Sequence, residues 1–453
     1  MLKEVVQEWR LDPENFVGLS TDGCNVMVGE HHSLMTLARK EFPNLIHMKC
    51  VAHSLDLCAK YAMKTMPSNL EYMIKHSYNW FAHSTIRQFN YQEILNVVGF
   101  DTLEFDDDEP REIIDPDPPK KPPLKLMSLS DTRWLVISDC VERILKQYDA
   151  LTAHFDIVNT NGKDYDARIL FDMFRDEHNR SLLLFLFPML RDLRRLTKLF
   201  QRKQANNLVI YNEIQVFFMD LARKILKDSI LRNSTVQQLC EINLSTTFCF
   251  LSLNDVTFGE VFVQSIRKFD VDTQNNLKNR AQAFMKQLFV QLQARLKGTL
   301  QTIRKLEPFC LPRIYENPPT IREFMKPFFM TDMVSLGILE NHVRQLVPMV
   351  KENDTTDSFW INIHNLKIGE EPKYHEISNG VVRMLCIPIS NAEVERTFSA
   401  ASYFKSWRRC EIKIDLLEAM LYCKFGLIWM GKSLSNFIPP MNILRYDASQ
   451  IYD

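Results

Sequence analysis

The first hundred residues carry the hydrophobic pattern of a small α/β layer. Residues 16–20 (FVGLS) form a short apolar run after the Asp12-Pro13 turn signal, and residues 45–49 form a second. Short apolar runs bounded by turn residues predict strands, whereas apolar residues three to four apart predict helices, here over 2–11, 32–42, 51–66 and 70–98. This alternation predicts an α/β layer, but two strands alone do not make a stable sheet. Other segments must therefore complete it.

The middle of the chain contains two segments with different residue patterns. Residues 100–130 contain the stretch DDDEPREIIDPDPPKKPP, whose acidic residues and prolines cannot bury enough apolar surface to order themselves, so we expect a linker. Residues 131–345 show little strand signal. Apolar residues recur there at helical spacing over 136–151, 181–201, 206–227 and 277–306. We predict an all-helical block of the size of one domain.

The last part of the chain, residues 346–433, begins and ends with predicted helices. Residues 385–389 are apolar and interrupted by Pro388, which predicts an extended approach to helices over 391–404 and 414–429. Ser390 or Asn391 is suited to cap the first of these helices. Taken alone, that helix is an ordinary capped amphipathic helix. We therefore divide the chain into five segments: residues 1–99, 100–130, 131–345, 346–433 and a tail, 434–453. The fold class expected is α/β plus all-α, mostly α overall.

Composition narrows the class of protein. The chain has 453 residues, of which 46% are hydrophobic and 25% are charged, as in ordinary globular proteins. No apolar run is long enough for a membrane span, and no secretory leader is recognisable at the start. The ten cysteines are spread singly, which favours reduced thiols in the cytosol or nucleus. The formal net charge of −1 gives DNA binding no support, so that function would rest on local patches.

Four groups of residues are candidates for chemistry, and each has a simpler alternative. Asp22 follows a strand, where a carboxylate reaches the sheet edge, but Asp-Gly also favours an Asx turn. Cys50 and His53 are half of a zinc site without a second half, so packing is the alternative. The segment RDLRRLTKLFQRK is either a solvated helix face or a phosphate-binding one; its candidate DNA contacts are Arg194, Arg195 and Lys198. Arg133 and Trp134 open the helical block, where Trp is commonly a core residue.

Two segments together resemble one family. Residues 390–399, of the form Ser-Asn-Ala-x-x-Glu-Arg-x-Phe-Ser, resemble the signature of hAT-family transposases and of host proteins derived from them. Residues 21–27 (TDGCNVM) are similar to the family's Thr-Asp-x-x-x-Asn-Met segment. The resemblance implies that Asp22 and Glu395 are the second and third of three metal-binding acids. It also implies a ribonuclease-H-like core interrupted by a large helical insertion.

The resemblance extends to further positions in the same order. The family carries a Cys-x-x-His where Cys50 and His53 stand, and a Thr-Arg-Trp before its insertion, which places Arg133 and Trp134 near DNA. An aromatic there can stack on an unpaired base, an interaction worth about 1–3 kcal/mol. Its C-terminal dimerisation region corresponds to the segments containing Phe359, Trp360 and Phe398. The resemblance thus implies a homo-oligomer in the nucleus, with DNA as a further partner and no membrane.

One departure from the family decides the predicted activity. Family members carry a BED-type zinc finger and a first catalytic Asp upstream of the position where this sequence begins. Two-metal strand transfer needs carboxylates that hold two cations about 3.5–4 Å apart, and Asp22 and Glu395 alone are too few. We therefore expect no enzymatic activity and no cofactor, with Mg²⁺ or Mn²⁺ bound only if the missing acid is supplied. The alternatives are an active transposase that lacks its N-terminal segment here, and a protein-binding helical scaffold.

Overall fold

The structure is a computed structural model, and it describes most of the chain. The described residues are 2–99, 126–127, 136–162, 164–201, 207–232, 234–244, 247–306, 309–311, 333–351, 354–405, 411–433 and 436–438. The predicted linker and tail, together with Arg133 and Trp134, lie almost wholly outside these ranges. The chain divides into two compact units, Met1–Ser390 and Asn391–Asp453, which we describe separately.

The first unit begins with a small α/β layer, as the hydrophobic pattern predicts. Strands β1 (Gly18–Thr21) and β2 (Ile46–Lys49) pair in parallel, with Thr21 opposite Lys49. Between them the chain forms α2 (Asn25–Val28) and α3 (Leu34–Glu41), while α1 (Leu2–Glu8) and a 3₁₀ turn over Pro13–Asn15 precede them. Apolar side chains of α1, α3 and the segment before β2 form a separate small core: Val6, Met35, Ala38, Phe42 and Leu45.

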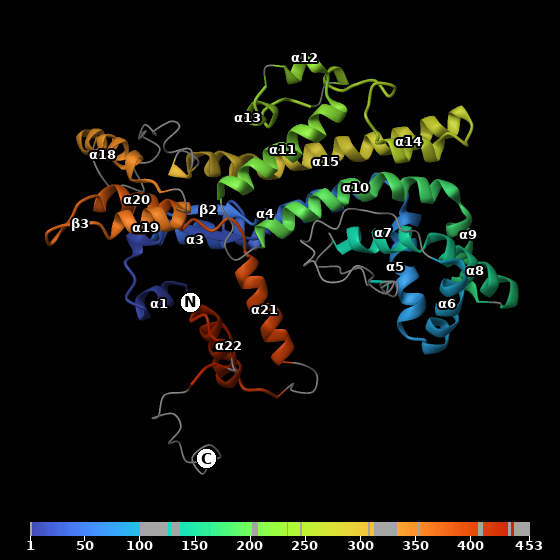
Figure 1. Cartoon of the computed structure of the whole chain (residues 1–453), viewed down its shortest axis with the longest axis horizontal. Coiled ribbons are helices and arrows are strands. Elements are labelled where there is room, and N and C mark those ends of the chain that lie inside the picture. The colour runs from blue at the N-terminus through green and yellow to red at the C-terminus, as the bar shows by residue number, and fades with distance from the viewer. Residues whose placement is uncertain are drawn as a thin grey trace, which may run out of the picture. The chain divides into compact units, whose positions relative to one another are not determined.

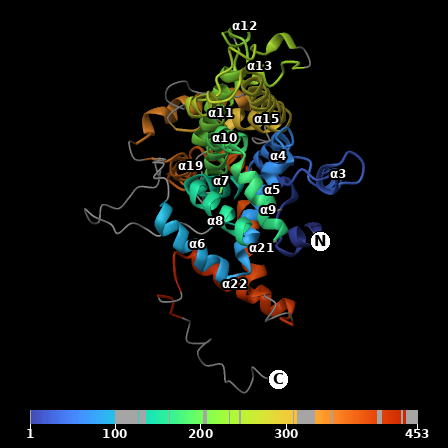
Figure 2. The ribbon, with the colours of Figure 1, turned by 90° about the vertical axis from the view of Figure 1, so that its right-hand side faces the viewer.

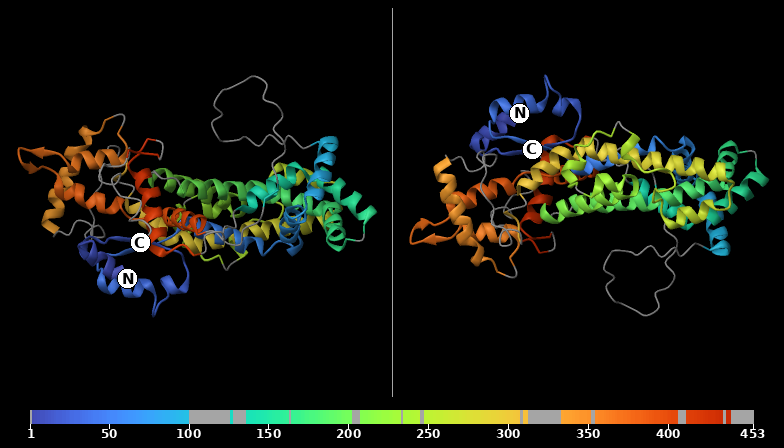
Figure 3. Two further views of the ribbon diagram at one scale, coloured as in Figure 1. Left: turned by 90° about the horizontal axis from the view of Figure 1, so that it is seen from below. Right: turned by 90° about the horizontal axis from the view of Figure 1, so that it is seen from above.

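Helices make up the rest of the first unit (Figure 1). In chain order they are α4 (Val51–Met63), α5 (Ser68–Ala82), α6 (Thr85–Val98), α7 (Ile137–Lys146), α8 (Tyr148–Asn161), α9 (Tyr165–Arg175), α10 (Glu177–Phe200), α11 (Asn207–Ile225), α12 (Asp228–Leu231), α13 (Val236–Leu239), a 3₁₀ turn over Thr247–Cys249, α14 (Glu260–Ile266) and α15 (Val271–Leu306). The fold is thus mostly helical, as predicted. Helices α10, α11, α15 and α4 run alongside one another (Figures 1 and 3), and their buried faces supply most of the main core.

The first unit ends in a helical cluster that carries a short hairpin. It comprises α18 (Met333–Leu346), a 3₁₀ turn over Val347–Met349, α19 (Thr356–His364), β3 (Lys367–Ile368), β4 (Glu371–Pro372) and α20 (His375–Leu385). Trp360 anchors the cluster because its buried indole Nε1 donates to the carbonyl of Phe309 at 2.8 Å. A capping box between Thr355 and Ser358 begins α19.

The second unit contains two helices in its described residues. These are α21 (Ala392–Phe404) and α22 (Ile414–Trp429), and they pack against each other. The predicted side-chain cap of α21 is wrong. Asn391 occupies the N-cap position without a side-chain capping hydrogen bond, and Ser390 Oγ instead donates to the carbonyl of Phe200 at 2.9 Å. No helix among the described residues of either unit is both long and apolar enough to cross a bilayer.

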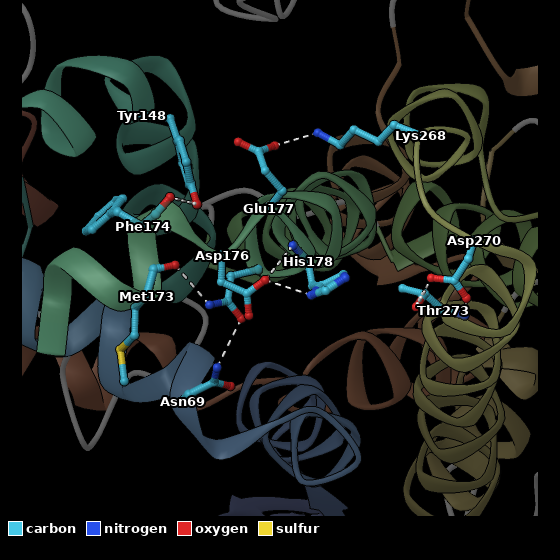
Figure 4. Close-up of polar contacts among 11 residues, drawn as sticks. Asn69, Tyr148, Met173, Phe174, Asp176, Glu177, His178, Lys268, Asp270 and Thr273 are labelled. Carbon is cyan, nitrogen blue, oxygen red and sulfur yellow. Dashed lines mark hydrogen bonds and ion pairs between the residues drawn. The ribbon is translucent and has the colours of Figure 1, made fainter.

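Polar contacts fix the point where α10 starts (Figure 4). Asp176 caps α10, with its Oδ1 accepting from the backbone N–H of His178 at 3.0 Å. Asn179, the third residue of the helix, accepts from Asn69 Nδ2 of α5 and donates to the carbonyl of Met173. Lys268 pairs with Glu177 at 2.6 Å. These contacts hold α5, α9 and the segment after α14 to the start of α10.

A buried histidine lies in the aromatic cluster between α5, α6 and α8. His154 Nε2 accepts a hydrogen bond from Trp80 Nε1 at 3.1 Å, and the rings of Phe81, Tyr91 and Phe155 surround it. Its Nδ1 has no hydrogen-bond partner among the described residues. Burial, reinforced by the nearby Arg87 guanidinium, lowers the pKa of His154 to about 4. The neutral imidazole is therefore the form that the fold accommodates.

We predict that His154 makes the first unit acid-sensitive. An unfolded histidine has a pKa of about 6.5, so the unfolded chain binds the extra proton as the pH falls below that value. The stability contributed by neutral His154 is full above pH 6.5 and is lost progressively down to about pH 4, by up to about 3 kcal/mol. Thermal melts monitored by circular dichroism between pH 7.5 and 4 measure this loss.

The matched control is His83, an exposed histidine beyond the end of α5. The His154→Gln variant should melt lower at pH 7.5 but show a shallower decline with acid than the wild-type chain. The His83→Gln variant should follow the wild-type curve. Parallel pH dependences for all three proteins would contradict the assignment.

Candidate functional site

Asp22 lies at the end of β1, as the sequence predicts. The side chain is half-buried, and its Oδ1 accepts from the backbone N–H of Cys24 at 3.4 Å, which is an Asx-turn contact. The other carboxylate oxygen takes part in no hydrogen bond within the described residues. Asp22 therefore serves the turn through one oxygen and keeps the second available for a cation or a hydrogen-bond donor.

A histidine on the neighbouring strand, not anticipated from the sequence, fixes the backbone before Asp22. Thr21 Oγ donates to the carbonyl of Asp22 at 2.9 Å and lies 2.8 Å from His47 Nε2. Since the hydroxyl has one proton, His47 Nε2 donates to Thr21 and carries the imidazole hydrogen. Burial, with the cations Arg39 and Lys49, lowers the pKa of His47. The only indication of this role of His47 in the sequence is that His47 and Lys49 are two residues apart on one predicted strand and so share a face of it.

The segment that precedes α21 completes the edge of this strand pair. The carbonyl of Ile389 accepts from the backbone N–H of Val51 at 3.4 Å, while the N–H of Cys50 donates to Thr21 at 2.8 Å. A Cβ placed on Gly18 would lie 2.7 Å from Pro388 Cδ and 3.2 Å from Ile387 Cα. The first unit thus brings three distant parts of the chain together at the ends of β1 and β2.

Glu395 lies five residues beyond this segment, in the first turn of α21, and its side chain is exposed. It belongs to the second unit and Asp22 to the first, so their pairing stays a prediction. Carboxylates are suitable ligands for Mg²⁺ or Mn²⁺. No group of three or more Asp, Glu, His or Cys able to hold a metal is assembled among the described residues. These residues do not fit a complete two-metal centre, and we derive no metal-dependent step from them.

Cys50 and His53 lie within one turn at the start of α4. Cys50 is the N-cap residue and is buried, and its carbonyl accepts from both the backbone N–H and the Oγ of Ser54 at 2.9 Å. His53 is half-buried on the first turn. Cys50 thus takes part in the start of α4, and the choice between packing and a zinc site stays a prediction.

Carboxylates neutralise much of the basic face of α10. Arg194 forms an ion pair with Asp139 of α7 in which both side chains are largely buried, and Arg195 pairs with Glu213 of α11 at 3.0 Å. Burial raises the pKa of Asp139 even though Arg194 and Lys198 oppose the shift. Lys198 itself is exposed. Two of the three DNA contacts predicted on α10 therefore form ion pairs with neighbouring helices.

Of the three residues predicted for dimerisation, the structure buries two and exposes the third. Phe359 and Trp360 are buried in the core of the first unit. Phe398 is 62% exposed on α21, and around it Val394 and Tyr403 are exposed as well. Helix α22 continues this apolar surface: Ile414, Leu416, Tyr422, Ile428 and Trp429 are all exposed. A partner in solution can reach α21 and α22, but not the side chains of Phe359 and Trp360 in this fold.

Comparison with known protein families accounts for this last part of the chain. Residues 348–427 match the model of the hAT family C-terminal dimerisation region. The match spans α19, the β3–β4 hairpin, α20, α21 and nearly all of α22. A search of curated proteins gave no significant match.

Through this dimerisation region the chain is related to hAT-family transposases. The resemblance found in residues 390–399 lies within the matched region, and the recognition of the family from the sequence is confirmed.

We predict that Gly18 cannot accept a side chain. In the Gly18→Ala variant the new Cβ would overlap Pro388, so β1 or the 387–390 segment must shift, which we expect to destabilise the first unit by about 1–3 kcal/mol. Gly23 is the matched control, because no atom lies within 4 Å of the position where its Cβ would be. Urea unfolding followed by tryptophan fluorescence should show a lower midpoint for Gly18→Ala only. Equal midpoints would refute the close approach.

Proposed function

We propose that this chain acts as a transposase-derived protein that assembles with a second copy of itself through α21 and α22. The observation that carries the proposal is the exposed apolar surface of these helices within the region that matches the hAT dimerisation model. A helix that is apolar on all sides is normally buried. Along the 16 residues of α22 the charged side chains are only Asp415, Glu418 and Lys424, and one residue, Leu427, is buried.

The exposed side chains on α21 and α22 are of the kind that drives association. Leu416 and Tyr422 of α22 are 56% and 62% exposed, and Phe398 of α21 is 62% exposed. Burial of apolar surface contributes about 25 cal/mol per Å², and clustered aromatic residues dominate the binding energy of interfaces. A homodimer would cover this surface with an equivalent surface of the second copy.

A charge placed at Phe398 should disrupt the dimer. We expect the Phe398→Glu variant to weaken self-association at least tenfold, because a carboxylate would be buried without a partner in the interface. The matched control is Phe89→Glu on α6, since Phe89 is 65% exposed and lies outside the matched region. Analytical ultracentrifugation between 0.5 and 50 μM measures both. A wild-type chain that sediments as a monomer throughout would rule the proposal out.

We further propose that residues 1–453 alone do not cleave DNA. Asp22 and Glu395 would provide two carboxylates, whereas a two-metal mechanism needs a third acidic ligand to hold both cations. The competing function is an active hAT transposase, to which a preceding segment would contribute the further acid. We assign the protein to the nucleus, where DNA is found; the nine described cysteines, all free, suit its reducing environment.

A nicking assay separates the two functions. We expect no cleavage of supercoiled DNA or of duplexes with inverted terminal repeats by the wild-type chain in 5 mM Mn²⁺, and none by Asp22→Asn or Glu395→Gln. Cleavage by the wild-type chain that both substitutions abolish would establish the enzyme instead. Cleavage that persists in both variants would indicate a contaminating nuclease. The assay would then be repeated with protein purified over a second column to remove that nuclease.

A further inference from the structure

A tyrosine on the outer side of α4 holds two cations. Lys64 Nζ lies 4.5 Å from the centre of the Tyr61 ring, and the guanidinium carbon of Arg295, from α15, lies 5.1 Å from it. Tyr61 is 38% exposed, Lys64 is exposed and Arg295 is half-buried, so solvent reaches this group of side chains. The electron-rich faces of an aromatic ring attract cations, which explains how two like charges are kept in one small area.

These two cations differ from those of α10 in lacking acidic partners. Within the described residues neither Lys64 nor Arg295 forms an ion pair, and Arg295 Nε donates instead to the neutral Gln291 Oε1 at 3.1 Å. Lys60, one turn earlier on α4, is also exposed and unpaired there. Two neighbouring cations repel each other, and an anion bound between them would offset that repulsion. The surface that carries Lys60, Lys64 and Arg295 is therefore suited to bind a negatively charged partner.

A polar groove continues this surface. Thr65 and residues of the first half of α15 line a groove of about 460 Å³, to which Asn275, Asn279 and Arg280 contribute hydrogen-bonding side chains and Asp272 a single carboxylate. Arg280 is exposed, and its Nε donates to Asn276 Oδ1. Helices α4 and α15 pack along each other, as Figures 1 and 2 show. The cations and the groove therefore lie on the same pair of helices.

We propose that the surface formed by Lys60, Tyr61, Lys64, Arg280 and Arg295 binds the phosphate backbone of duplex DNA. The inference rests on the proposed function of a transposase-derived protein, for which DNA is the relevant polyanion. Cations already contact the Tyr61 ring, which leaves it poorly placed to stack on an unpaired base. Lysine, arginine and asparagine side chains are typical donors to phosphate oxygens. Binding through them is independent of sequence and depends steeply on salt.

Fluorescence anisotropy with a labelled 30-base-pair duplex, measured from 50 to 250 mM salt, tests the surface. The double substitution Lys64→Gln with Arg295→Gln removes two phosphate contacts. It should reduce the slope of log K against log salt by about two and the affinity at 50 mM salt by about tenfold or more. Tyr61→Phe should keep the affinity, since the ring remains, whereas Tyr61→Leu should lower it.

Two further pairs of substitutions locate the binding. Lys75→Gln with Arg168→Gln removes the same number of exposed charges from α5 and α9 and should leave the slope unchanged. Arg191→Gln with Lys198→Gln tests the face of α10. If Arg295→Gln prevents folding, Lys60→Gln with Lys64→Gln replaces it, because both residues are exposed.

The labelled strand of the duplex, measured alone, is the single-stranded comparison. Three results would overturn the inference: no binding of duplex by the wild-type chain, an equal or larger loss from the α10 pair, or tighter binding of the single strand than of the duplex. Ultracentrifugation of the same samples separates this inference from the proposed dimer. A dimer that persists in the Lys64→Gln, Arg295→Gln protein without DNA affinity supports both proposals, whereas a monomeric wild-type chain that binds DNA with the expected slope supports the surface alone.

Discussion

The contact between β1 and the segment of residues 387–390 is the constraint on which the α/β part of the structure depends. Two parallel strands are too few for a stable sheet, and β1 and β2 form only one pair. The chain returns to cover them: Pro388 packs directly on Gly18, the N–H of Val51 reaches the carbonyl of Ile389, and Arg383 Nη2 donates to Asn15 Oδ1 at 2.6 Å. The absence of a side chain at residue 18 is what allows this approach.

Charge compensation organises the helical part in a comparable way. Basic residues that pair with carboxylates, such as Arg194 with Asp139 and Arg195 with Glu213, join helices to one another. Those that contact aromatic rings without acidic partners, Lys64 and Arg295, remain accessible. For a chain with a formal net charge of −1, the distribution of partners is a better guide to anion binding than the total charge.

The sequence predicted local structure well and long-range contacts poorly. Apolar runs between turn residues predicted strands at 16–20 and 45–49, and these are found at Gly18–Thr21 and Ile46–Lys49. Helical spacing predicted the helices around Phe398 and Tyr422 within a few residues. Spacing on α10 placed Arg194 and Arg195 on one face, but the pattern of one helix contains no information about Asp139 or Glu213 on other helices. For the same reason neither the contact of Arg295 with Tyr61 nor that of His47 with Thr21 could be foreseen.

The bond between Arg383 and Asn15 joins residues 368 positions apart. A ribosome adds about 5–20 residues per second, so β1 waits roughly 20–70 s for the segment that covers it. During that interval helices that follow one another closely, such as α8 with α9 and α10 with α11, can already pack through short-range contacts, which form quickly. The nascent strand pair would meanwhile present an unpaired edge to other chains, and a chaperone that shields such edges would be useful until residues 383–390 have been made and have packed against β1.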